Sequence, residues 1–80
     1  MSKTYTTFTF EVTHDDECDM WVGVCDALGI ATEAPSYEAL TARIWLIAPE
    51  MAQENGHNVA LDCLRLRFEH VELADNLMAA

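Results

Sequence analysis

The hydrophobic period of this 80-residue chain changes at Pro35. Before Pro35, apolar and polar side chains alternate along residues 4–13, where Phe8, Phe10 and Val12 share one parity. Alternation with a period of two is typical of a strand with one buried face. After Pro35, apolar residues recur at spacings of three and four, which is typical of an amphipathic helix. The two periods together predict an α+β fold.

Two further strands are predicted between the first strand and the helix. Residues 20–25 are apolar at both parities, which is typical of a strand in the centre of a sheet. The polar residues 14–19 form an exposed turn before this strand, and residues 26–29 form a tight turn after it, in which Gly29 can adopt positive φ. Residues 30–33 make a short third strand. These elements predict an antiparallel three-stranded meander.

The predicted helix begins at Ser36, whose side chain can cap the first turn. Proline at position 49 removes an amide donor, so we expect the helix to kink near residues 45–49 or to break into two pieces. Asn55 and Gly56 are predicted to end it. The apolar stripe expected to pack on the meander consists of Tyr37, Leu40, Ile44, Ile47 and Met51.

A fourth strand is predicted within residues 59–73, which gives the element order β-β-β-α-β. The parity of its apolar residues changes twice, which indicates a bulge or a bend. Two arrangements are left open, because this strand can pair within its own chain or with a neighbouring copy. Residues 1–80 are predicted to form a single domain. The tail at residues 74–80 is expected to be flexible, with Leu77 and Met78 able to dock onto an apolar neighbour.

The composition is strongly acidic, with 14 Asp and Glu against 4 Lys and Arg and a formal net charge of −10. This charge repels phosphate backbones, so direct binding to nucleic acid is not expected. It favours a basic protein partner through complementary fields, although solubility alone is an alternative explanation. No apolar run approaches the roughly 20 residues that span a bilayer, and no signal peptide is recognisable. We therefore predict a cytoplasmic protein without membrane association.

The sequence contains no recognisable catalytic, cofactor-binding or metal-binding motif. Phosphate-binding glycine loops and nucleophile elbows are absent, and the acidic residues between the first two strands lack the spacing of a calcium-binding loop. Cys18, Cys25 and Cys63 form no CxxC pair, which favours free thiols in a reducing compartment. We therefore predict a protein that is not an enzyme and needs no cofactor or metal.

Two surfaces are predicted to contact a partner. The middle of the helix is apolar nearly all the way round, so Trp45 and Leu46 project away from the stripe and form a candidate interface. The alternative is that the last strand or the tail covers them. The second surface is the acidic turn, which consists of Asp15, Asp16, Glu17 and Asp19. Because the core of so small a domain contributes little net stability, we also expect a homodimer.

The ordered series of these elements resembles the HicB-like antitoxin family. The series comprises a strand at residues 8–12, the acidic turn, a strand with Trp21, an Asp-x-Leu-Gly turn, a Ser-x-Glu-Ala-Leu helix start at Ser36 and an Asn-Gly helix end. The resemblance implies a partial ribonuclease-H-like fold without catalytic carboxylates, which neutralises a small basic RNA-cleaving toxin. Cys25 and Ala27 replace the prolines usual in the family's turn, and a DNA-binding module is not expected. The alternative is an orphan homodimeric domain without a toxin partner.

Overall fold

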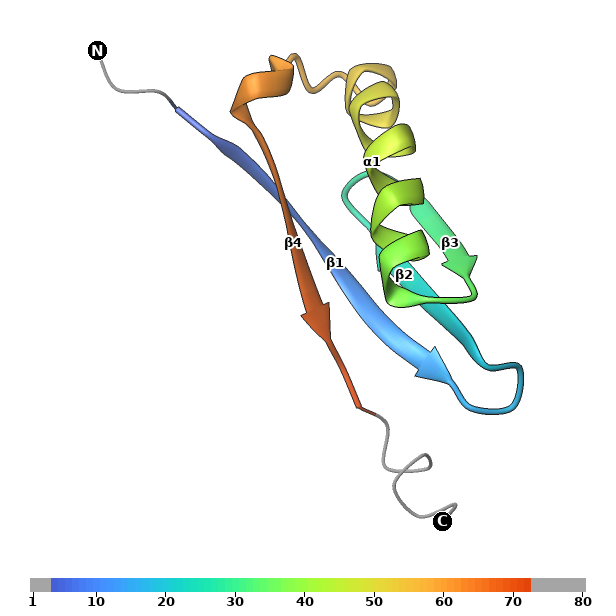
Figure 1. Cartoon of the computed structure of the whole chain (residues 1–80). Coiled ribbons are helices and arrows are strands. Elements are labelled where there is room, and N and C mark those ends of the chain that lie inside the picture. The colour runs from blue at the N-terminus through green and yellow to red at the C-terminus, as the bar shows by residue number, and fades with distance from the viewer. Residues whose placement is uncertain (1–3, 73–80) are drawn as a thin grey trace.

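A four-stranded mixed sheet with one helix on it forms the fold (Figure 1). The computed structural model describes residues 4–72, so the predictions about the tail at residues 74–80, including Leu77 and Met78, lie outside it. The strand order is β3-β2-β1-β4, with β2 antiparallel to both of its neighbours and β4 parallel to β1. The predicted meander, helix and fourth strand are confirmed. The elements are β1 (Thr6–Asp15), β2 (Met20–Cys25), β3 (Ile30–Ala34), α1 (Tyr37–Glu54), a 3-10 turn η1 (Leu61–Cys63) and β4 (Leu64–His70).

The first hairpin follows the predicted alternation but extends it. Phe8, Phe10 and Val12 are buried on the face that the helix covers. β1 runs on to Asp15, two residues past its predicted end, so His14 is a strand residue and not part of the turn. His14 has the same parity as Val12, which directs its side chain to the helix side of the sheet.

Helix α1 begins and ends where the sequence predicts. The Ser36 hydroxyl accepts a hydrogen bond from the Ala39 N–H at 3.1 Å, and Asn55 is the C-terminal cap. Gly56 follows with a φ of 81°, a left-handed conformation that glycine adopts without steric cost. Gly29, in the turn between β2 and β3, likewise has a positive φ of 65°.

Pro49 does not break the helix. Although its ring removes the amide that would bond to the Trp45 carbonyl, α1 continues through it as one element of 18 residues. Ala48 and Ala52 are both buried, so packing against the sheet holds the turns on either side of the proline. Of the two outcomes that the sequence left open, a kink or a break, the break is therefore excluded.

The fourth strand is shorter than predicted and starts after a 3-10 turn. Leu61 and Cys63 belong to η1, and the strand proper begins at Leu64. The first change of parity therefore comes from this turn, and the second falls where β4 ends at His70. The chain needs no bulge within the strand, because the extra residue is taken up in the turn that precedes it.

The helix lies over β2 and β3 and approaches the sheet closely at Gly23. A Cβ atom at this position would lie 3.0 Å from the Ile44 Cδ1 atom and 3.4 Å from the Leu40 Cδ2 atom. Both helix residues are fully buried. α1 rests mainly on β2 and β3, so the opposite half of the helix side is only partly covered. Phe8, Phe10 and Val12 of β1 are buried there, but His14, Phe68 and His70 keep part of their surface exposed, and this half carries the candidate site.

Candidate functional site

Four rings line the partly uncovered half of the sheet and form what we call the aromatic strip. Trp21 lies at its centre, with its ring 5.6 Å from that of Tyr37 and 5.3 Å from that of His70, measured between centroids. Phe68 extends the strip from Tyr37 at 6.4 Å. Tyr37 is 40% exposed, and Trp21 and Phe68 are half-buried. The strip is therefore anchored in the core on one side and accessible on the other.

Strand pairing brings the strip together. Trp21 pairs with Ala34 at the end of β3, which places it beside the first turn of α1 and therefore beside Tyr37. The parallel register of β4 sets Phe68 opposite Phe10 of β1, with the two ring centroids 5.8 Å apart. Residues from three parts of the sequence thus meet at one end of the sheet.

His14 joins the aromatic strip to the acidic turn. Its ring lies 5.0 Å from that of Trp21, its partner across the hairpin. Its Nδ1 atom lies 2.7 Å from the Asp16 Oδ1 atom, and its Nε2 atom lies 2.9 Å from the Asp19 Oδ1 atom. These hydrogen bonds, the one to Asp19 first, raise the pKa of His14. The imidazole therefore binds its proton more tightly than a free histidine does, and it holds the acidic turn beside the strip.

The acidic turn has a defined shape. Asp15 closes the hairpin opposite Met20, and its Oδ1 atom accepts a hydrogen bond from the Glu17 N–H at 3.1 Å. Asp19 adopts a φ of 52°, a left-handed conformation that aspartate tolerates better than most residues. All four acidic side chains of the turn are exposed. The predicted residues Asp15, Asp16, Glu17 and Asp19 are thus gathered at one end of the hairpin.

The arginines of residues 4–72 are engaged elsewhere. Arg43 donates to the Glu33 carbonyl at 3.1 Å, and Arg65 lies 3.8 Å above the centre of the Tyr5 ring. Arg67 pairs with Glu69 at 3.1 Å. All Asp and Glu side chains within this part of the chain are exposed, so none of its carboxylates is withdrawn from the solvent.

Trp45 and Leu46, the predicted interface on the helix, point in different directions. Trp45 is 42% exposed and Leu46 is 79% exposed. Two residues along a helix correspond to about 200° of rotation. Because Arg43 reaches β3, Trp45 lies on the opposite flank of α1, the flank next to β1 and β4, whereas Leu46 points away from the sheet. Only Trp45 therefore borders the half of the sheet that carries the aromatic strip.

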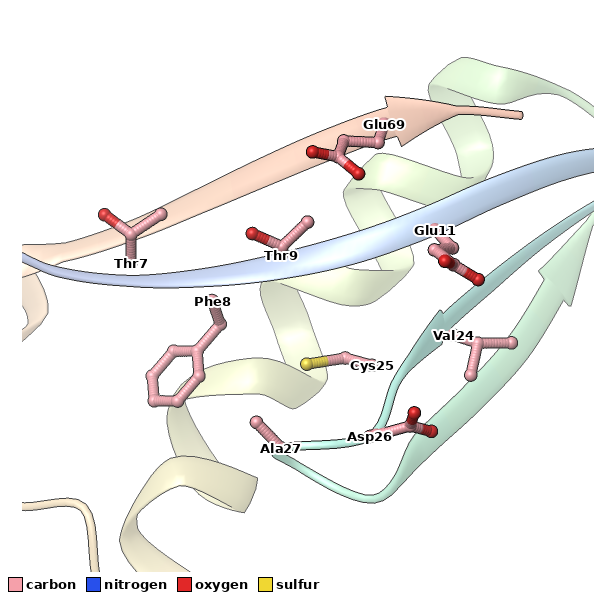
Figure 2. A pocket seen from close by; sticks show the side chains of 9 residues that line it. All are labelled: Thr7, Phe8, Thr9, Glu11, Val24, Cys25, Asp26, Ala27 and Glu69. Carbon is pink, nitrogen blue, oxygen red and sulfur yellow. The ribbon is translucent and has the colours of Figure 1, made fainter.

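A hollow of about 320 Å³ lies where β1 extends beyond the end of β2 (Figure 2). The pairing of β1 with β2 stops at Glu11 and Val24, and β2 then turns away through Asp26. The carboxylates of Glu11, Asp26 and Glu69 line the hollow, but no histidine, lysine or arginine does.

The three cysteines differ in exposure, and Cys25 is the one that lines the hollow. Cys25 is 2% exposed within the core, and Cys63 is half-buried. Cys18 is exposed in the acidic turn, where the negative charge of Asp15 raises its pKa. A raised pKa lowers the fraction of the nucleophilic thiolate. Within residues 4–72, no three His, Cys, Asp or Glu side chains are grouped so that they could hold a metal ion.

The sequence predicted part of this site and missed the rest. It identified the acidic turn and the exposed Trp45. Tyr37 was assigned to the apolar stripe, and Trp21, Phe68 and His70 were not assigned to a partner-binding surface. Local periodicity could not have joined them, because the strip depends on the parallel pairing of β4 with β1. The available signal was the presence of rings in two of the predicted strands, Trp21 in the second and Phe68 with His70 in the fourth.

The fold and site define a small α+β domain with a mixed four-stranded sheet, one helix, and no positive sign of catalysis in its described residues. Residues 7–78 match the family described as a domain of unknown function (DUF1902), and the chain belongs to this family. It is similar to the hypothetical protein TTHA1013 from the extremely thermophilic bacterium Thermus thermophilus, whose crystal structure is known. The two share 34% sequence identity with a TM-score of 0.72, over 82% of this chain and 93% of that one.

No curated protein matches the sequence. The family description names no activity, so the resemblance to HicB-like antitoxins stays a prediction. Within residues 4–72, α1 is not apolar enough over its length to cross a membrane.

Proposed function

We propose that this domain is a non-catalytic protein-binding module whose partner is a small basic protein. The observation that carries the proposal is the junction of the aromatic strip with the acidic turn through His14. Accessible Trp and Tyr rings are the side chains that contribute most to protein interfaces. Carboxylates beside them attract lysine and arginine side chains, which also bind favourably over aromatic faces.

The resemblance to HicB-like antitoxins suggests what the partner does. A small RNA-cleaving toxin needs basic residues to hold its substrate, and an acidic domain can cover those residues in competition with RNA. In this proposal the acidic turn draws the toxin in, and the aromatic strip, with Trp45 on the neighbouring flank, forms the contact. The net charge of −10 supports such a partner.

Co-expression with the products of adjacent reading frames tests the proposal. We expect one small basic protein to purify with this domain in a stoichiometric complex, and its RNA-cleaving activity to stop when the domain is added. If no adjacent product binds, the antitoxin function is wrong.

Substitutions locate the contact. Tyr37→Ala should raise the Kd of the complex by about 30-fold, the loss expected for an aromatic residue at the centre of an interface. Asp16→Asn together with Asp19→Asn should slow association and reduce its dependence on salt. Leu46→Ala is the matched control on the outer face of the helix and should leave the Kd unchanged. A large effect of Leu46→Ala with none of Tyr37→Ala would place the contact on that outer face.

A second candidate function is the orphan homodimer without a toxin partner. One separate observation favours it: β4 pairs with β1 on one side only, so its outer edge is open to another strand. Sedimentation velocity over a range of concentrations would detect this dimer directly.

A further inference from the structure

The two edges of the sheet differ in how they are protected. At the β3 edge, the strand has five residues, α1 lies over it, and Arg43 donates to its Glu33 carbonyl. At the β4 edge, the strand has seven residues and contains no proline, and Figure 1 shows no helix or strand of residues 4–72 on its outer side. Long edge strands without such protection are templates for pairing with another strand.

The groups that point outward from β4 can be assigned. The Val71 N–H donates to the Val12 carbonyl at 2.8 Å, so the odd-numbered residues direct their backbone groups toward β1. Because these directions alternate along a strand, the even-numbered residues direct theirs to the free edge. Leu66, Phe68 and His70 thus present N–H and C=O groups that a second strand can bond.

We propose that this edge pairs with the β4 edge of a second copy, antiparallel and centred on Phe68. This register sets Phe68 opposite Phe68 of the second copy and Leu66 opposite His70. It also sets Arg67 opposite Glu69 on the other face of the sheet, once on each side of the two-fold axis. Opposite charges in such cross-strand positions are stabilising. The strand is therefore complementary to itself in charge.

The neighbouring registers are less favourable. Centring the pairing on Arg67 places two Arg67 side chains opposite each other at the axis, which offsets part of the gain from the two Arg65–Glu69 pairs beside it. Centring it on Leu66 places Arg65 opposite Arg67 on both sides of the axis. Like charges in directly opposed positions are destabilising. Arg65 is in addition held over the Tyr5 ring. Charge thus selects the register centred on Phe68.

Pairing in this register would also extend the candidate site. Phe68 belongs to the aromatic strip, so the two-fold axis would join the strips of both copies across the centre of an eight-stranded sheet. The inference rests on the homodimer named as the second candidate function and does not depend on a toxin partner.

Charge reversal tests the proposed interface. Wild-type protein should sediment as a monomer–dimer equilibrium, and Glu69→Arg should raise the dimer Kd about tenfold, because it places Arg67 opposite an arginine on both sides of the axis. The double variant Arg67→Glu with Glu69→Arg should return the Kd close to the wild-type value. Glu54→Arg is the matched control, since it changes the net charge equally on the helix surface and should not weaken the dimer.

A backbone test uses His70. His70→Pro removes an outward N–H, whereas His70→Ala removes the ring and keeps the N–H. The proline variant should weaken the dimer more than the alanine variant, with circular dichroism showing that both are folded. If the wild-type protein dimerises but neither Glu69→Arg nor His70→Pro changes the dimer Kd, the β4 interface is overturned and the homodimer is not. A wild-type protein that stays monomeric at high micromolar concentration overturns both.

Discussion

The two halves of the helix-covered face are built from different side chains. Over β2 and β3, a glycine and fully buried aliphatic residues let α1 approach closely, as Gly23, Leu40 and Ile44 do. Toward β4, the strip consists of rings that keep part of their surface exposed: Phe68 and His70 of β4, with Trp21 of β2 and Tyr37 of α1 beside them. One helix cannot cover four strands, so the fold has a half that is closed by packing and a half that is left for contact. The difference separates the residues that stabilise the domain from those available to a partner.

The largest expected effect comes from opening the closed half. Ile44→Ala removes a fully buried side chain and leaves a cavity, so the free energy of unfolding should fall by about 2–5 kcal/mol. Urea denaturation measures this change. Leu46→Ala, on the outer face of the same helix, is the control and should change stability by no more than about 0.5 kcal/mol. Equal losses in the two variants would contradict the division between the halves.

Adding side-chain volume in the closed half should destabilise the domain somewhat less than Ile44→Ala does. Gly23→Val introduces methyl groups against Ile44 and should lower the free energy of unfolding by about 1–3 kcal/mol. Gly23→Ala should have a smaller effect, because the end of the Ile44 side chain can shift by a few tenths of an ångström. Combining Gly23→Val with Ile44→Ala should be less destabilising than the sum of the two changes. Additive losses would mean that the two residues do not share this space.

The hydrogen bond from the Ala39 N–H to the Ser36 side chain at the start of α1 should also contribute to the stability of the closed half. Ser36→Ala removes the side-chain acceptor of the Ala39 N–H, and thermal or urea unfolding should show a loss of about 1 kcal/mol. Ser36→Asp keeps an acceptor and should retain most of the stability. If Ser36→Ala and Ser36→Asp lose the same amount, the hydrogen bond is not the cause.

The smallest effect is expected at the open half and depends on pH. Hydrogen bonds to Asp19 and Asp16 raise the pKa of His14, so protonated His14 stabilises the folded state. This contribution is fully present below the unfolded value of about 6.5 and is lost as pH rises through the folded pKa. An NMR titration of the imidazole should show a higher pKa than that of the same residue with Asp16→Asn and Asp19→Asn. An unchanged titration would contradict the link between strip and turn.

Local features of the chain were predictable because local chemistry determines them. The alternation of Phe8, Phe10 and Val12, the cap at Ser36 and the positive φ of Gly29 each follow from the residue and its neighbours. Whether α1 continues through Pro49 was left open by the sequence, and burial of the flanking turns decides it by outweighing the lost hydrogen bond. These cases show that tertiary packing decides the structure where the local sequence permits more than one conformation.

The candidate site was only half predictable for a related reason. The acidic turn is contiguous in the sequence, so composition alone identifies it. The aromatic strip requires the register that sets Phe68 beside Phe10, and nothing near Phe68 in the sequence specifies a parallel partner far away. Gly23 was likewise read as an ordinary strand residue, because only the position of α1 shows that a side chain there would be crowded.

The parallel pairing of β4 with β1 also bears on how the chain folds during synthesis. β1 is made first and β4 last, and Thr6 is paired with Leu64. Until β4 has emerged from the ribosome, one edge of β1 has no partner and Phe10 lacks its contact with Phe68. Contacts between such distant residues slow folding and prolong the exposure of unpaired edges. The edge of β1 that β4 will cover is therefore exposed longest, and it is where pairing with a strand of another chain could begin.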